Sequence, residues 1–257
     1  MRTFLLAVLV SISAACATSE PPQAGAPLAS PTSRPLSVLF VGNSLTFVND
    51  VPALTRSLAA SSTPPSRLTV YSVTSGGATL AEHWRRGDAV RALRNRRPDV
   101  LIIQGQSAEP LTAAADFARY AQLLKDEADS VGARTVLFQT WARPYGDPFY
   151  SRSASGGSPA AMQAKLNHAY DSLAQRLQVD VARVGEAFAF VQRSAPDTAL
   201  LDGSQHATVA GSYLAAAVLF RTLCRCSPLG ATFTAGLPHT AARALREAAD
   251  PVSPGNP

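Results

Sequence analysis

Apolar runs of strand length alternate with segments of helical periodicity along this chain, and that alternation restricts the possible folds more than any other feature. A short apolar run bounded by turn residues is typical of a buried strand, whereas apolar residues at every third or fourth position predict an amphipathic helix. Strands that alternate with helices five times predict a parallel sheet covered on both faces, by the right-handed crossover rule. We therefore expect an α/β fold.

The first predicted strand is the run that starts at Ser37 and ends in the turn Gly42-Asn43-Ser44. The other predicted strands are residues 68–74, 100–104, 135–141 and 179–184. The predicted helices are residues 51–60, 80–96, 111–130, 162–177, 185–193, 209–223 and 240–249. Residues 143–159 are dense in Pro, Gly, Ser and aromatics, and we expect either a lid or substrate loop there or an ordinary surface loop.

Length and charge narrow the class of protein. A chain of 257 residues is long enough for one domain with a well-filled core, and an apolar fraction of 46% excludes wholesale disorder. The net charge of +5 comes almost entirely from arginine, with one concentration in residues 85–97. Acidic residues are interspersed with these arginines, so a solvated helix face explains the cluster better than a nucleic-acid partner does.

The first sixteen residues have the form of an export signal. Arg2 precedes a short apolar core at residues 4–10, and small residues lead to Cys16. The apolar core is too short for a confident membrane span. Cys16 after small residues resembles the bacterial lipoprotein signal, in which that cysteine is lipidated and becomes the mature N-terminus. We expect a lipoprotein of the periplasm or cell envelope, held to the membrane only through Cys16, with plain secretion as the alternative.

The remaining chain divides into three predicted parts. Residues 17–35 are rich in Pro, Ala, Ser and Thr without apolar periodicity, and form a flexible linker. Residues 36–250 form the folded domain, and residues 251–257 a disordered tail. Cys224 and Cys226 are one residue apart, which is poor geometry for a disulfide, and no further Cys or His stands at zinc-ligand spacing near them.

Residues suited to chemistry follow three of the predicted strands. Ser44 follows the first, Gly77 the second and Gln106 the third, while a loop near the C-terminus supplies His206 with Asp202 upstream. The carboxyl ends of parallel strands share one edge of a sheet, so these residues should meet there. A serine in this place is suited to be a nucleophile, although Asn-Ser more commonly forms a turn or caps a helix. A histidine at a helix start is likewise often a capping or packing residue.

Together these residues resemble the SGNH hydrolases, also called GDSL esterases and lipases. The first family block, normally Gly-Asp-Ser, corresponds to Gly42-Asn43-Ser44, and the glycine of the second to Gly77. The third block, normally Gly-x-Asn, is most similar to a Gln-x-Gln-Ser variant at residues 104–107, and the fifth block supplies His206. The resemblance covers roughly residues 36–229, apart from the loop 145–158.

This resemblance implies a three-layer α/β/α fold of flavodoxin type, with a five-stranded parallel sheet, and ester hydrolysis through an acyl-serine intermediate. Ser44 would attack the carbonyl, His206 would act as general base, and Asp202 would orient the imidazole. The oxyanion would be held by the N–H groups of Ser44 and Gly77 and by the Gln106 amide. No metal or organic cofactor is implied.

Two departures from the family pattern leave alternatives open. The family acid usually lies three residues before the histidine, where this chain has Gly203, so Asp202 needs a loop bulge to reach His206. Otherwise a backbone carbonyl orients the ring and the site is a Ser-His dyad. Gln106 also carries one methylene more than the family asparagine. The substrate is expected to be an ester, such as a short acyl or acetyl group on carbohydrate. Acyl transfer by the same serine and an inactive surface carbohydrate-binding protein are the rival functions.

Overall fold

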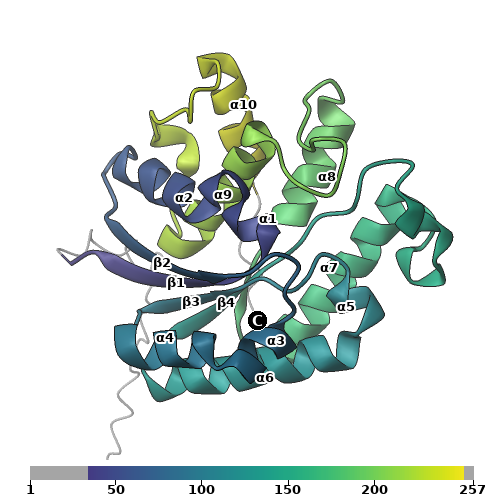
Figure 1. Ribbon diagram of the computed structural model, residues 1–257. Coiled ribbons are helices and arrows are strands. Elements are labelled where there is room, and N and C mark those ends of the chain that lie inside the picture. The colour runs from purple at the N-terminus through teal and green to yellow at the C-terminus, as the bar shows by residue number, and fades with distance from the viewer. Residues whose placement is uncertain (1–33, 252–257) are drawn as a thin grey trace, which may run out of the picture. The chain divides into compact units, whose positions relative to one another are not determined.

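The computed structural model describes residues 34–251, which form a three-layer α/β/α domain (Figure 1). The predicted signal 1–16, the linker up to residue 33 and the tail beyond residue 251 lie outside the described residues. All strands of the sheet are parallel, in the order β2-β1-β3-β4-β5, which confirms the predicted fold class. The strands are β1 Leu36–Gly42, β2 Leu68–Thr74, β3 Val100–Ile103, β4 Arg134–Phe138 and β5 Asp180–Ala182.

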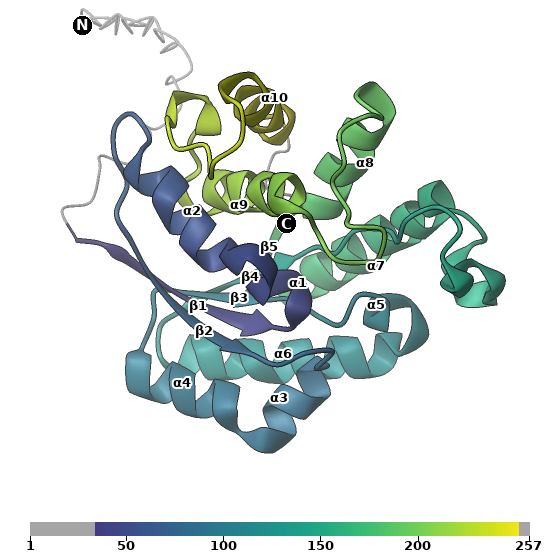
Figure 2. The ribbon, with the colours of Figure 1, turned by 45° about the horizontal axis from the view of Figure 1, so that its top comes forward.

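Helices cover both faces of the sheet (Figure 2). One face is covered by α2 Val51–Ala60, α8 Val184–Ser194, α9 Val209–Cys224 and α10 His239–Ala249. The other is covered by α3 Leu80–Arg86, α4 Asp88–Arg96, α6 Ala114–Ser130 and α7 Pro159–Leu177. The short helices α1 Ser44–Phe47 and α5 Glu109–Thr112 follow the carboxyl ends of β1 and β3. The 3₁₀ turns are η1 Val48–Asp50, η2 Pro148–Ser151, η3 Ser153–Ser155 and η4 Pro228–Gly230.

The core has two halves, one on each face of the sheet. Along β1, Val38 and Phe40 belong to the half under α9, whereas Leu39 and Val41 belong to the half under α3 and α6. This alternation follows from the two-residue period of a strand. Each such fully buried side chain contributes about 1.5–3 kcal/mol to stability. Because β1 is buried on both faces, its carboxyl end gives the residues that follow it a fixed position.

Several predicted boundaries were wrong for identifiable reasons. The helix predicted at 80–96 is two helices, because Gly87 at φ 68° ends α3 in a left-handed cap. The helix predicted at 111–130 begins as α5 and breaks at Ala113 before α6. The strand predicted at 135–141 ends at Phe138, since its neighbour β5 ends at Ala182, opposite Phe138. Within the described residues, the helices are too short or too polar to span a bilayer.

Candidate active site

Ser44 is the first residue of α1, directly beyond the carboxyl end of β1. Asn43 is the N-cap of this helix, and its side chain accepts a hydrogen bond of 3.1 Å from the N–H of Leu45. Position 42 requires glycine because neighbouring side chains pack closely against it. A Cβ there would lie 2.6 Å from both Gln104 Oε1 and Thr46 Oγ1. The sequence Gly-Asn-Ser thus turns the chain sharply and places a hydroxyl at the edge of the sheet.

A fully buried amide pair fixes this turn to the neighbouring strand ends. Gln104 Oε1 accepts from the N–H of Asn43 at 2.9 Å and from Thr46 Oγ1 at 2.8 Å. Gln104 Nε2 donates to Asn43 Oδ1 at 3.0 Å, and Asn43 Nδ2 donates to the carbonyl of Ala78 at 3.0 Å. The sequence analysis gave Gln104 no role of its own. A lone amide at the end of an otherwise apolar strand was the available signal, because a buried amide needs partners.

His206 meets Ser44 although 162 positions separate them, with 3.0 Å between His206 Nε2 and Ser44 Oγ. Two groups from distant elements hold the loop that carries His206. Asn49 Nδ2 donates to the carbonyl of Ala207 at 2.9 Å, and Trp141 Nε1 donates to the carbonyl of Gln205 at 3.0 Å. The structure therefore brings together a hydroxyl and an imidazole at hydrogen-bond distance.

Asp202 reaches His206 through the hydroxyl of Ser204 and has no hydrogen bond of its own to the ring. Ser204 Oγ lies 2.6 Å from Asp202 Oδ1 and 3.1 Å from His206 Nδ1. The loop bends at Gly203, where φ is 92°, a value that glycine adopts without steric cost. The direct contact expected for Asp202 is thus replaced by a bridge, because the additional residue in this loop leaves a gap that one hydroxyl fills. Ser204 was missed by the sequence analysis.

The direction of this bridge decides which nitrogen of His206 can act as a base. An ionised carboxylate only accepts hydrogen bonds, so the single proton of the Ser204 hydroxyl goes to Asp202. A lone pair of Ser204 Oγ then faces His206, whose Nδ1 donates. Nε2 is left unprotonated toward Ser44 in the neutral ring. Hydrogen bonds from the Ser204 hydroxyl and N–H lower the pKa of Asp202 below its ordinary value, which keeps the carboxylate in the accepting form.

Backbone donors suited to an oxyanion lie beside Ser44. Within residues 34–251, the N–H groups of Ser44 and Gly77 have no hydrogen-bond acceptor. Ser44 is in the first turn of a helix, where N–H groups lack intrahelical partners. Gly77 lies in the turn between β2 and α3, which the bond from Asn43 to Ala78 ties to the serine. These two N–H groups therefore have no acceptor of their own, and their role as oxyanion donors stays a prediction.

The side chain of Gln106, the third predicted oxyanion donor, already makes hydrogen bonds to its neighbours. Its Oε1 accepts from the N–H of Ala108 at 2.9 Å, and its Nε2 donates to Ser107 Oγ at 3.2 Å. Its own N–H donates to Glu109 at 2.8 Å, a buried carboxyl whose pKa is raised by loss of hydration. One hydrogen of the Gln106 amide has no partner among the described residues, so its role at the oxyanion stays a prediction.

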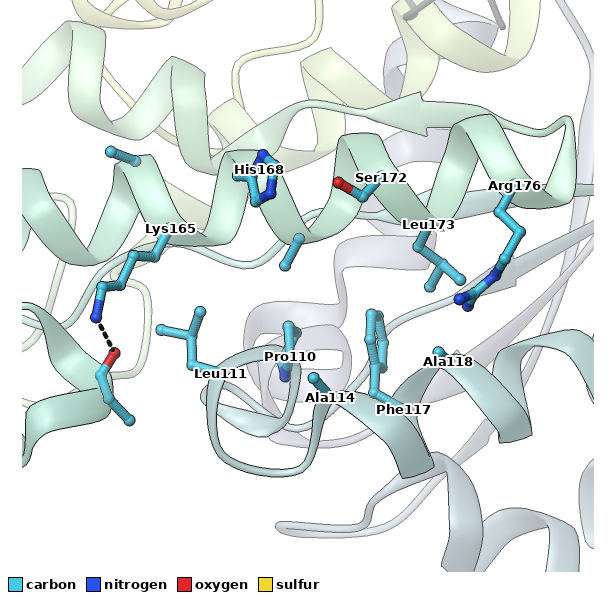
Figure 3. A pocket seen from close by; sticks show the side chains of 13 residues that line it. Pro110, Leu111, Ala114, Phe117, Ala118, Lys165, His168, Ser172, Leu173 and Arg176 are labelled. Carbon is cyan, nitrogen blue, oxygen red and sulfur yellow. Dashed lines mark hydrogen bonds between the residues drawn. The ribbon is translucent and has the colours of Figure 1, made fainter.

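A separate hollow of about 660 Å³ lies between α5, α6 and α7 (Figure 3). Leu111 and Phe117 line one side of it and Leu173 of α7 the opposite side, and Lys165 and Arg176 lie near its two ends. Neither Ser44 nor His206 lines it. Among residues 34–251, no three His, Cys, Asp or Glu side chains are grouped closely enough to bind a metal ion.

The fold of this chain is similar to those of several solved structures. No protein-family model matches the chain, and no curated protein is similar to it. Among solved structures it is similar to a protein from Slackia heliotrinireducens described as a candidate SGNH hydrolase, with TM-score 0.64 and 28% identity over 74% of this chain and 100% of that one. It is also similar to a DUF4886 family protein from Bacteroides uniformis, with TM-score 0.66 and 15% identity over 84% and 93% of the two chains. For Axe2, an acetylxylan esterase from Geobacillus stearothermophilus, the TM-score is 0.56 and the identity 15%, over 72% and 93%.

Proposed function

We propose that this chain, which has the fold of the SGNH hydrolases, is an ester hydrolase that removes short acyl groups from carbohydrate outside the cytoplasm. In this proposal Ser44 is the nucleophile and His206 the general base. The observation that carries the proposal is the distance of 3.0 Å between Ser44 Oγ and His206 Nε2, at a sheet edge with free N–H donors. A nucleophile, a base and an oxyanion site are the three parts that acyl transfer requires.

The proposed reaction proceeds in two steps. Ser44 Oγ attacks the ester carbonyl while its proton moves to His206 Nε2, and the N–H groups of Ser44 and Gly77 stabilise the oxyanion. Collapse of this intermediate breaks the bond to the alcohol, which takes the proton from His206. Water then attacks the acyl-serine and gives a proton to His206, and when the bond to Ser44 Oγ breaks, the acid is released and Oγ takes this proton back from His206 Nε2. Asp202, acting through Ser204, stabilises the imidazolium formed in each step.

Two observations support carbohydrate as the acylated partner. The solved structures of similar fold include an acetylxylan esterase. In addition, a polar hollow of about 400 Å³ lies against Gln106, and sites for small ligands usually have volumes of 300–1,000 Å³. The proposed reaction needs no cofactor.

Export is proposed from residues 1–16 alone. A charged start, an apolar core and small residues before Cys16 suit a lipoprotein signal, which would place the domain in the periplasm or cell envelope. Fractionation of cells that express wild type and Cys16→Ser tests this. Wild type in the membrane fraction and Cys16→Ser in the soluble exported fraction support a lipid anchor, whereas wild type in soluble exported form indicates plain secretion. Wild type in the cytoplasm overturns both.

Labelling by a fluorophosphonate probe tests the nucleophile without knowledge of the true substrate. We expect wild type to be labelled at Ser44 and to cleave short-chain aryl esters, and Ser44→Ala to do neither. Ser194→Ala is the matched control, because Ser194 is exposed at the end of α8. Equal ester cleavage by wild type and Ser44→Ala would remove the serine mechanism and favour a carbohydrate-binding protein. Appearance of the acyl group on an added sugar, instead of free acid, would indicate acyl transfer.

A further inference from the structure

The hollow beside Gln106 lies between α5 and the segment that follows β4. Its lining includes Gln106, Thr112, Arg143, Asp147, Phe149 and Arg152. It is joined to the loop before His206 by Ser107, whose hydroxyl lies 3.4 Å from Arg143 Nη2 and donates to Gln205 Oε1 at 2.9 Å. Gln205 directly precedes His206, so hydrogen bonds through Ser107 connect this hollow to the loop that carries the proposed base, although neither Ser44 nor His206 lines the hollow.

Two guanidinium groups of this hollow lie against one aromatic ring. The Cζ atoms of Arg143 and Arg152 are 4.7 and 5.9 Å from the centroid of the Phe149 ring. Phe149 is itself buried, and its N–H donates to Asp147 Oδ1 at 2.8 Å. Stacking on an aromatic face orients the planar guanidinium group and leaves its N–H edge free to bind a ligand.

The hydrogen bonds of these arginines are incomplete. Arg143 donates to Asp147 Oδ1 at 3.3 Å and to Ser107 Oγ at 3.4 Å, both at the long end for such bonds, and its Nε is buried without an acceptor. The Arg152 side chain is exposed and has no hydrogen-bond acceptor within the described residues. Since Asp147 is the only acidic residue of the lining, the hollow carries one positive charge in excess.

We propose that this hollow binds a carboxylate of the substrate, so that the ester cleaved by Ser44 is carried by an acidic sugar. The inference rests on the proposed function and specifies its substrate class. A carboxylate is planar and accepts two parallel hydrogen bonds from a guanidinium fork, which matches the exposed guanidinium of Arg152. It also compensates the excess positive charge. A neutral sugar would do neither.

A pair of substrates that differ only in the carboxylate tests this. Acetate release is measured from galacturonic acid and from galactose, each acetylated at the same hydroxyl. We expect wild type to favour the acidic sugar by about tenfold in kcat/KM, the effect of one charge-assisted hydrogen bond. Because the Arg152 side chain is exposed, the preference should decrease with added salt.

Variants of Arg152 identify the source of the preference. We expect Arg152→Gln to lose most of the preference and Arg152→Lys to keep part of it. Arg56→Gln, which removes an exposed arginine of α2, should keep it in full. Equal kcat/KM for the two sugars in wild type, or an unchanged preference in Arg152→Gln, overturns the carboxylate site. Turnover of neither sugar also overturns it, and labelling of Ser44 by fluorophosphonate in the same sample then decides whether ester hydrolysis fails with it.

Discussion

Replacement of Ser204 by alanine removes the bridge between Asp202 and His206 while leaving the reacting groups in place. Its hydroxyl makes the bonds of 2.6 Å to Asp202 Oδ1 and 3.1 Å to His206 Nδ1. Without it, the carboxylate no longer fixes which ring nitrogen carries the proton. We therefore expect Ser204→Ala to lower kcat for an aryl ester with little change in KM, because the lost interaction acts on the general base.

The magnitude follows from the exposure of this loop. A buried acid bonded directly to the histidine of a catalytic triad affects kcat by about 10⁴. Here Asp202 and Ser204 are exposed, and water can replace part of a lost hydrogen bond. A net loss of about 1–1.5 kcal/mol is expected, which corresponds to about tenfold in kcat. Ser204→Thr keeps a hydroxyl and should restore much of the rate.

A double-mutant cycle with Asp202→Ala tests the bridge directly. If the two residues act as one unit, Asp202→Ala, Ser204→Ala and the double variant lower kcat by similar factors. Unfolding by urea, measured in parallel, shows whether any loss of rate comes from loss of structure. A Ser204→Ala rate within twofold of wild type, or effects that multiply in the double variant, would refute the reasoning.

Three further predictions concern the residues that support the site. Gly42→Ala should lower the free energy of unfolding in urea by about 1–3 kcal/mol, because its Cβ would lie 2.6 Å from Gln104 Oε1. Trp141→Phe keeps a ring able to stack on Phe188 but removes the bond to the Gln205 carbonyl, so we expect kcat to fall several-fold, with about 1 kcal/mol less stability by urea unfolding. Burial raises the pKa of Glu109, so its charged form is disfavoured in the folded protein, and its contribution to stability is lost as pH rises from about 4 through the raised pKa. Glu109→Gln should remove that part of the pH dependence in urea unfolding measured at a series of pH values.

Each of these has an outcome that contradicts it. Wild-type stability in Gly42→Ala would mean that Gln104 moves away without cost. Unchanged kcat in Trp141→Phe would show that the loop carrying His206 does not depend on this bond. A stability difference between wild type and Glu109→Gln that is constant from pH 4 to neutral would show that the pKa of this carboxyl is the same in the folded and the unfolded protein.

The local pattern of the sequence was sufficient for the fold class. Strands such as β1 are apolar on both faces because helices cover both sides of the sheet. Such apolar runs can be recognised in the sequence without knowledge of which distant residues they contact. The positions of Ser44 and Gly77 after strand ends could be predicted for the same reason. Boundaries such as the end of β4 at Phe138 could not be predicted from the local sequence, because they depend on where the neighbouring strand ends.

The arrangement around His206 was decided by tertiary structure alone. Sequence spacing showed that Asp202 is one residue too far from His206, but the bridge through Ser204 depends on the bend at Gly203 and on bonds from Asn49 and Trp141. The partners of Gln104 and the bond from Ser107 to Gln205 in the loop before His206 are likewise contacts between distant segments. Periodicity reports which face of an element is buried, because burial follows from local hydrophobicity. Which side chains meet there depends on how the whole chain packs.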